Sequence, residues 1–330
     1  MKIAVVILNW NGKELLKKFL PSVISHSAEA TVYVADNAST DDSIEFLRKN
    51  FPQVSIIQNE INGGYAKGYN DALRNLDEDI FILLNSDIEV TAGWLRPIID
   101  VFEHAPKVGA VQPKILDFNN KSYFEYAGAA GGFIDKYAYP FCRGRIFEEI
   151  EKDKGQYDQD ETIFWASGAC LGIRKEAFLE AGGFDEDFFA HQEEIDLCWR
   201  LYNLGYSIIY ASKSTIYHVG GATLSSINPM KTFFNFRNSL YLITKNVPSP
   251  QVTSVLIIRM LLDGIAAFRF LGQGKFNHFF AVFRAHMSFY SSFSAMWKKR
   301  KKFPKKGQYF RIRSVVYAHY LRGSKKYSEI

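Results

Sequence analysis

The feature that most constrains the fold is a regular alternation, over the first 85 residues, between short apolar segments and segments with helical character. The apolar segments are rich in β-branched residues and span residues 3–8, 31–35, 54–57 and 80–84, as expected of buried strands. Stretches such as residues 41–50 and 66–76 favour helices between them. Strands that alternate with helices predict a parallel sheet whose ligands bind beyond the carboxyl ends of its strands.

Polar residues follow these predicted strands directly. Asn9 follows the first strand, Asp36 the second, and Asn85-Ser86-Asp87 the fourth. The first strand is not followed by GxGxxG, and the chain has no GxxxxGK[ST] loop, so neither a dinucleotide-binding fold nor a P-loop is indicated. An acidic edge instead suggests a divalent cation that bridges carboxylate and phosphate oxygens.

Chain length and charge predict two parts. The chain has 330 residues; residues 230–330 hold 19 Lys or Arg and two acids, whereas the first 229 hold 21 basic and 33 acidic residues. We therefore expect an α/β domain at 1–228 and a basic, mainly helical extension at 229–330. The three cysteines show neither a metal-site nor a disulfide spacing, which fits a cytoplasmic protein.

Four motifs, in this order, resemble the signatures of family 2 glycosyltransferases with a GT-A fold. They are VVILNWNG at residues 5–12, VADNASTD at 34–41, NGGYAKGYN at 62–70 and LLNSD at 83–87. The similarity extends over about residues 1–225, and the extension, with Arg237-Asn238, resembles the ends of bacterial rhamnosyltransferase-like members. This resemblance implies a Rossmann-like, nucleotide-diphospho-sugar transferase domain.

The resemblance also implies the residues that bind a UDP- or dTDP-sugar. Asp36 matches the acid that accepts a hydrogen bond from the pyrimidine ring, and Asn9 matches a base-contacting position. Lys67 lies in the third motif. Asn85 and Asp87 occupy the place of the DxD motif, with Asn85 at the ribose and Asp87 on a divalent cation. The alternative for Asp36 and Asp87 is a residue that only caps a turn.

A later motif, IYHVGG at residues 216–221, resembles the segment whose His completes the metal site beside Asp87. A single His near a strand end is more often structural, and the motif is what makes His218 a candidate ligand. Imidazole together with carboxylate and phosphate oxygens suits Mn²⁺, and Mg²⁺ is also compatible.

The acceptor half of the family resembles residues 165–170 and 182–197. Trp165, Ser167 and Gly168 fall in the first of these segments and are candidates for the acceptor region.

The second segment contains the acidic motif of the family, which supplies the base that removes the acceptor proton. Glu194 aligns with the usual Asp, Glu193 is its close competitor, and Asp196 shares a helix face with Glu193. The alternative is that these acids only favour the start of a helix through its dipole.

The extension combines Phe-rich stretches with basic residues. Charges interrupt its longest apolar stretch, residues 252–271, which argues against a transmembrane span. Residues 276–297, followed by the basic run 298–302, predict a helix that lies on an anionic membrane at the inner face of the cytoplasmic membrane. A packed subdomain and a nucleic-acid surface are the alternatives, and the acidic domain argues against nucleic acid.

These observations predict an inverting, metal-dependent hexosyltransferase that transfers a sugar to a saccharide or a lipid-linked saccharide in bacterial surface polysaccharide synthesis. A catalytically silent nucleotide-sugar-binding or scaffold protein is the main alternative, because Asn85 and Glu194 depart from the family pattern. A processive synthase is less favoured, since its QxxRW motif and multiple spans are missing.

Overall fold

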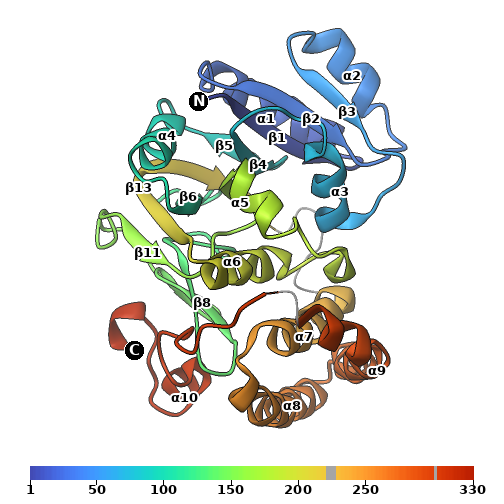
Figure 1. Cartoon of the computed structure of the whole chain (residues 1–330), viewed down its shortest axis with the longest axis vertical. Helices are drawn as coiled ribbons and strands as arrows, with labels where there is room; N and C mark the ends of the chain where they lie inside the picture. Colours follow the sequence, from blue (N-terminus) through green and yellow to red (C-terminus); the bar gives the residue numbers. More distant parts are fainter. Residues whose placement is uncertain (221–227, 301–302) are drawn as a thin grey trace.

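The computed structural model describes residues 1–220, 228–300 and 303–330, which form a mixed sheet covered by helices and followed by a helical C-terminal region (Figure 1). The strand order is β11-β13-β6-β12-β4-β1-β2-β3, and β5 pairs with β13. The strands are β1 (Ile3–Asn9), β2 (Thr31–Asp36), β3 (Ser55–Gln58), β4 (Ile80–Asn85), β5 (Ile88–Val90), β6 (Val108–Asp117), β11 (Glu161–Ile163), β12 (Cys170–Arg174) and β13 (Ser207–His218).

The first half of this sheet is parallel, as the sequence predicts. Neighbouring strands among β1–β4 pair in parallel, and β1 alternates between two cores, with Ala4 and Val6 in one and Val5 and Ile7 in the other. The second half is mixed, because β12 runs antiparallel to β4 and β6. The helices of this region are α1 (Lys13–Ser25), α2 (Ser43–Asn50), α3 (Gly64–Leu73), α4 (Leu95–His104), α5 (Lys175–Glu180), η1 (Glu186–Phe188) and α6 (Glu193–Leu204).

A second, four-stranded sheet lies beside the first and has the order β10-β9-β8-β7. Its strands are β7 (Gly132–Ile134), β8 (Pro140–Cys142), β9 (Arg145–Ile146) and β10 (Glu149–Ile150). Strands of two or three residues carry too little alternation to stand out in a sequence.

The C-terminal region contains α7 (Pro229–Asn246), α8 (Ser249–Gly272), α9 (Phe276–Lys299), α10 (Val315–Tyr320) and η3 (Tyr327–Glu329). Leu240, Leu242 and Phe289 belong to the same hydrophobic cluster as Ala4 and Leu83 of the sheet, so these helices share one core with the α/β part. Over the described residues, no helix combines the length and the apolarity that crossing a bilayer requires.

Candidate active site

The carboxyl ends of β1 and β2 bring Asn9 and Asp36 side by side, since the two residues are partners in the parallel register. Asn9 Nδ2 donates a hydrogen bond to Asp36 Oδ1 at 3.0 Å, and the backbone N–H of Ser39 donates to Asp36 Oδ2 at 3.0 Å. Both side chains are buried. The Asp36 carboxylate is therefore held in a fixed direction, as directional recognition of a ring N–H requires.

Asn85 and Lys67 are placed differently with respect to this edge. Asn85 ends β4 and pairs in register with Leu8, so it lies on the same edge as Asn9. Lys67 Nζ lies 2.8 Å from a carboxylate oxygen of Asp71, four residues along α3, which is an ordinary pair on a helix surface. The structure thus brings Asn85 to the edge and shows Lys67 in a local ion pair.

Asp87 and His218 meet where β5 pairs with β13, because His218 is the register partner of Ile88. Asp87 Oδ1 lies 3.1 Å from His218 Nε2, and both side chains are buried. Burial alone would lower the pKa of His218, but the adjacent carboxylates of Asp87 and Glu125 raise it to about 10. The adjoining Gly221 lies outside the described residues.

Glu125 is a component of this site that no motif indicates. Its Oε1 lies 3.3 Å from His218 Nδ1, and its Oε2 accepts a hydrogen bond from the backbone N–H of Ala127. Because the two ring nitrogens point apart, Glu125 cannot bind the same ion as Nε2. Its carboxylate faces Nδ1 instead, which is the position of the carboxylates that accompany metal-binding histidines.

The donor set of Asp87 and His218 fits a divalent cation, since it offers one carboxylate and, once the cation displaces the proton of the ring, one imidazole. Across the described ranges, no group of three or more His, Cys, Asp or Glu side chains is arranged to hold a metal ion. Phosphate oxygens and water would therefore have to complete the coordination.

The acceptor-region candidates lie mainly in the core. Trp165 Nε1 donates to the carbonyl oxygen of Phe133 at 2.9 Å, and the backbone N–H of Ser167 donates to a buried Gln112 side chain at 2.8 Å. Gly168 is partly exposed, and its carbonyl oxygen accepts a hydrogen bond from the Tyr65 hydroxyl. Trp165 and Ser167 therefore anchor residues 165–168 to the protein core.

Glu193 and Glu194 begin α6 and differ in their surroundings. Glu193 is 4% exposed, and its Oε2 has no hydrogen-bond partner in the described part of the chain. Burial raises the pKa of Glu193 well above its ordinary value, and the charge of Glu194 adds to this. Glu194 is partly exposed, and burial raises its pKa to about 7. Burial therefore favours the protonated form of Glu193, whereas Glu194 can exchange a proton near neutral pH.

Asp196 occupies an ion cluster that joins α6 to α7. It is fully buried and accepts hydrogen bonds from Lys245 at 2.7 Å, Asn246 at 2.8 Å and Arg200 at 2.9 Å. Burial alone would raise the pKa of Asp196, but the charges of Lys245 and Arg200 lower it. Lys245 also pairs with Asp185 at 2.5 Å. A buried carboxylate that accepts three such hydrogen bonds, two of them from cations, is typical of a structural ion cluster.

The backbone just before α6 adopts a conformation that side chains disfavour. Phe189, His191 and Gln192 have φ values of 61°, 69° and 70°, each of which costs roughly 1 kcal/mol or more. Asn238 of α7 is buried, and its Nδ2 lies 2.7–3.0 Å from three carbonyl oxygens of residues 188, 190 and 191. The C-terminal region thus holds the segment that leads into Glu194.

Comparison with known sequences identifies relatives for most of this region. Residues 4–182 match the family described as "Glycosyl transferase family 2". An N-acetylglucosaminyl-diphospho-decaprenol L-rhamnosyltransferase of Mycobacterium tuberculosis is 26% identical over 231 residues, which is 66% of this chain and 75% of the relative. The rhamnosyltransferase WbbL of Escherichia coli is 25% identical over 218 residues, covering 63% and 80%.

Solved structures of low sequence identity share the fold. GalNAc-T7, determined with UDP, GalNAc and Mn²⁺, aligns with a TM-score of 0.54 and 18% identity over 66% of this chain and 43% of its own. A mannosyltransferase of Pyrobaculum calidifontis, determined with GDP-Man and Mn²⁺, aligns with a TM-score of 0.51 and 16% identity over 89% of this chain and 75% of its own.

Proposed function

Because this chain belongs to glycosyl transferase family 2, we propose that it is an inverting, metal-dependent hexosyltransferase of bacterial surface polysaccharide synthesis. Its donor is a UDP- or dTDP-sugar, and its acceptor is a lipid-linked saccharide, because the mycobacterial relative is named for transfer to an N-acetylglucosaminyl-diphospho-decaprenol. The observation that carries the proposal is the ordered arrangement of Asp36, Asp87 and His218 at the carboxyl edge of the sheet.

On the donor side, Asp36 accepts a hydrogen bond from the ring N–H of the base, and Asn9 holds Asp36 in place. Asn85 lies where it can meet the ribose, and Lys67 would have to leave Asp71 to reach a phosphate. Asp87 and His218 would hold the divalent cation, with Glu125 behind the ring; such an ion stabilises the charge of the leaving diphosphate.

On the acceptor side, Glu194 is the base. A carboxylate whose pKa is near 7 is ionised enough at neutral pH to take the proton of an attacking hydroxyl and basic enough to hold it. Burial raises the pKa of Glu193 well above its ordinary value, and Asp196 is paired with Arg200 and Lys245, so we assign both acids a supporting role. The transfer yields the glycoside with inverted anomeric configuration and a nucleoside diphosphate.

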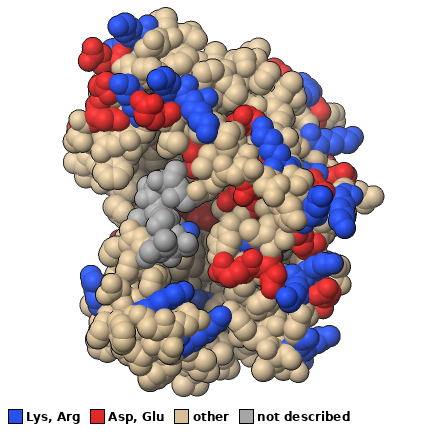
Figure 2. Space-filling model, turned by 180° about the vertical axis from the view of Figure 1, so that it is seen from behind, with Lys and Arg blue, Asp and Glu red and all other residues tan. Residues whose placement is uncertain are grey.

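The α8–α9 hairpin supports a membrane-bound acceptor. Each helix carries one stripe of apolar side chains that are at least 45% exposed. They are Ile257, Leu261, Ile265 and Phe268 on α8, and Phe276, Phe280, Phe283, Met287 and Tyr290 on α9. Asp263 is the sole acid between residues 229 and 300; it is fully buried and paired with Arg259. The matching region of Figure 2, at the lower left, accordingly shows scattered blue groups on a tan surface without red.

We therefore place the protein on the inner face of the cytoplasmic membrane, with this hairpin against anionic lipid. The basic run 298–302 contributes less than its sequence suggests, because Lys299 pairs with Asp185 and Asp187 and Arg300 donates to the carbonyl oxygen of Thr244. Lys301 and Lys302 lie outside the described residues. Exposed cations such as Arg284 remain beside the stripe.

A donor screen tests the proposed reaction. UDP-, dTDP- and GDP-sugars are incubated with Mn²⁺ or Mg²⁺ and a short diphospholipid-linked acceptor sugar, and release of the nucleoside diphosphate is measured. NMR of the product then gives its anomeric configuration. A protein that binds a donor but turns none over with any acceptor would be a nucleotide-sugar-binding protein instead, and a retained configuration would refute inversion.

Flotation with anionic liposomes tests the membrane assignment. The double variant Phe268→Ser/Phe280→Ser should bind less than the wild type. The control Leu179→Ser, at an equally exposed position on α5, should bind as the wild type does. Binding of the wild type should weaken but persist as salt rises, because salt screens the charges and not the inserted apolar groups. Equal binding by all three proteins would refute the role of the hairpin.

A further inference from the structure

A chain of buried polar side chains runs from the α8–α9 hairpin to the residue that precedes α6. Arg259 of α8 is 4% exposed, and its Nη2 donates a hydrogen bond to Ser239 Oγ of α7 at 2.9 Å. Ser239 Oγ also accepts a hydrogen bond at 3.0 Å from Nε2 of Gln192, and both of these residues are buried. Two direct hydrogen bonds therefore join α8 to Gln192.

Gln192 sets the start of the helix that carries Glu194. Its φ of 70° lies in the left-handed region, which residues with a side chain disfavour. Its carbonyl oxygen accepts a hydrogen bond from the backbone N–H of Asp196, the first such bond of α6. Its side chain turns to α7 instead, where it donates to the carbonyl oxygen of Asn235 at 3.1 Å and to Ser239. Because Glu194 lies two residues further along, a shift of Gln192 redirects the Glu194 carboxylate.

Arg259 is itself held at several points. Its Nε donates to Asp263 Oδ1 at 2.9 Å, and its Nη1 donates to the carbonyl oxygens of Tyr137 and Ala138, both at 3.4 Å. Its guanidinium carbon lies 3.7 Å from the centroid of the Tyr139 ring. A guanidinium presents its donors in one fixed plane, so these contacts determine where Nη2 points.

Stability alone does not explain a charged pair at this position. Asp263 is fully buried, and its second oxygen lies 3.3 Å from His286 Nε2 of α9. Replacing a buried ion pair by apolar residues of similar volume is often neutral or stabilising, because desolvation offsets the attraction between the charges. Apolar residues could fill the space of Arg259 and Asp263 but could not donate to Ser239. The link to Gln192 is thus a physical reason for a guanidinium here.

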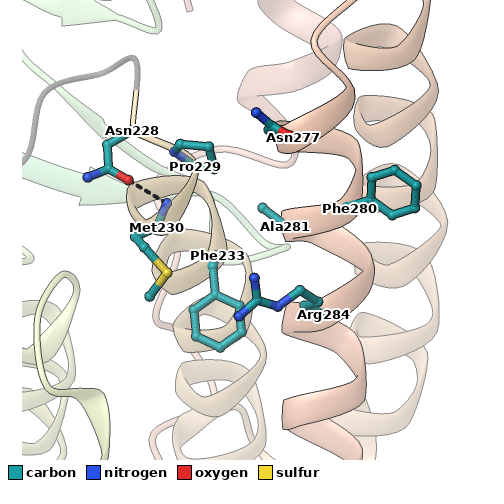
Figure 3. Close-up of a pocket in the computed structure, with 8 residues that line it drawn as sticks. All are labelled: Asn228, Pro229, Met230, Phe233, Asn277, Phe280, Ala281 and Arg284. Atoms are coloured by element: carbon teal, nitrogen blue, oxygen red, sulfur yellow. Dashed lines mark hydrogen bonds between the residues drawn. The ribbon is translucent and has the colours of Figure 1, made fainter.

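The hairpin also determines where Ser239 lies, because α7 packs against it. Figure 3 shows the Arg284 guanidinium of α9 extending toward the Phe233 ring of α7, and its carbon lies 5.9 Å from the ring centroid. On α8, Arg259 is buried on the side toward α7, whereas Leu261 of the apolar stripe is 66% exposed. One helix pair therefore presents the apolar stripe outward and the polar link inward.

The backbone of Gln192 also affects the proton affinity of Glu194. Burial raises the pKa of Glu194, and hydrogen bonds from the backbone of Glu194, Gln192 and Ile195 oppose this effect. Displacement of Gln192 would therefore raise this pKa further. Four other titratable side chains respond to the charge of Glu194, and burial is the main cause that raises the pKa of each. They are Glu193 and Cys198 of α6, Tyr65 of α3 and Cys142 of β8.

We propose that Arg259 is a positioning residue for the base: through Ser239 it holds Gln192, and it thereby directs Glu194 toward the acceptor hydroxyl. This role rests on the proposed function, in which Glu194 is the base. It makes the α8–α9 hairpin necessary for the rate of transfer as well as for contact with the membrane.

Two variants interrupt the link at different points. The double variant Arg259→Met/Asp263→Leu removes the buried charges together, and Ser239→Ala removes only the hydroxyl between α8 and Gln192. With the acceptor of the donor screen, each should lower kcat about tenfold or more, because a small displacement of a reacting group is costly, and leave donor affinity unchanged. The acidic limb of the kcat–pH profile should move to higher pH. The combined triple variant should lose no more than the weaker of the two, since both act through one link.

Arg174→Met is the control for a general loss of stability. Arg174 donates to the carbonyl oxygens of Phe102 and Val108, and it pairs in register with Ile80 at the opposite edge of the sheet. This variant should lower the free energy of unfolding without changing kcat. Hydrogen exchange of the peptide that covers residues 188–196, followed by mass spectrometry, should be faster in the two link variants and unchanged in Arg174→Met.

Three results would overturn the role of Arg259: a normal kcat in both link variants, even with faster exchange; a kcat that falls while the pH profile stays in place; or an equal loss of kcat in Arg174→Met. In each of these cases the wild type transfers sugar, so the proposed reaction stands. A wild type that transfers no sugar would instead refute the proposed reaction, and the positioning role with it.

Discussion

Replacing Glu194 by Gln should lower transfer and, at the same time, stabilise the protein at alkaline pH. Burial is the main cause that raises the pKa of Glu194 from 4.5 to about 7, so the folded protein ionises this carboxyl less readily than the unfolded chain does. Because the folded pKa lies above the unfolded one, the contribution of this group to stability is complete below about pH 4.5. It is lost as the pH rises toward 7.

The size of this loss follows from the two pKa values. A pKa difference of about 2.5 corresponds to at most about 3 kcal/mol above pH 7. Glu194 keeps partial contact with solvent, so we expect about 2 kcal/mol. Gln cannot ionise and avoids this cost, and the variant should therefore exceed the wild type in unfolding free energy at pH 8 and by much less at pH 5.

Urea unfolding at pH 5 and pH 8 measures the stability difference, with Glu176→Gln, an exposed glutamate of α5, as the control that should match the wild type. In the transfer assay, wild-type activity should fall about tenfold from pH 8 to pH 6 as the base becomes protonated, and Glu194→Gln should lose roughly 10²-fold or more. If Glu194→Gln is no more stable than the wild type at pH 8, burial of the ionised Glu194 side chain does not lower the free energy of unfolding. If Glu193→Gln is the inactive variant, the base has been assigned to the wrong residue.

Four further substitutions test the site. Asp87→Asn should abolish Mn²⁺-dependent donor binding in calorimetry, and Glu125→Gln should weaken it about tenfold; donor affinity that is indifferent to EDTA would refute the metal site. Lys245→Met should lower the unfolding free energy by about 3 kcal/mol, since Asp185 and Asp196 lose their buried partner, and a change in urea unfolding below about 1 kcal/mol would contradict this. Asn238→Ala should lower kcat of transfer more than donor affinity, and an unchanged kcat would show that it does not position the base.

The parallel half of the sheet is the part of the fold that the sequence predicts well. The predicted strands at residues 3–8, 31–35, 54–57 and 80–84 end within one residue of β1–β4, because their apolar runs are continuous. Of these strands, β1 and β4 are buried on both faces. The helix at residues 276–297 is likewise confirmed as α9. The strands of the second sheet, with two or three residues each, lack such a pattern.

Some residues of the candidate site are likewise predictable from a sequence pattern, and others are not. Asn9, Asp36, Asn85 and Asp87 were predictable as neighbours at one edge of the sheet because they directly follow predicted strands, and parallel strands bring their carboxyl ends together. Glu125 was not, because it lies in a loop 38 residues after Asp87 and meets His218 only through tertiary structure. Sequence spacing also cannot rank the acids of α6, since burial and cation contacts distinguish them.

The C-terminal region, expected as a basic membrane-binding extension, also packs against the segment that we propose as the acceptor half of the site. Lys245 of α7 neutralises both Asp185 and Asp196, and Asn238 binds the strained backbone that precedes Glu194. Because α7 contacts the base segment on one side and packs against α9 on another, docking of α8 and α9 on a membrane would hold the base at a set height above the lipid. In this arrangement, the proposed surface-bound acceptor would meet Glu194 in one orientation. This is a physical reason for one helix to contact both the proposed base segment and the proposed membrane-binding hairpin.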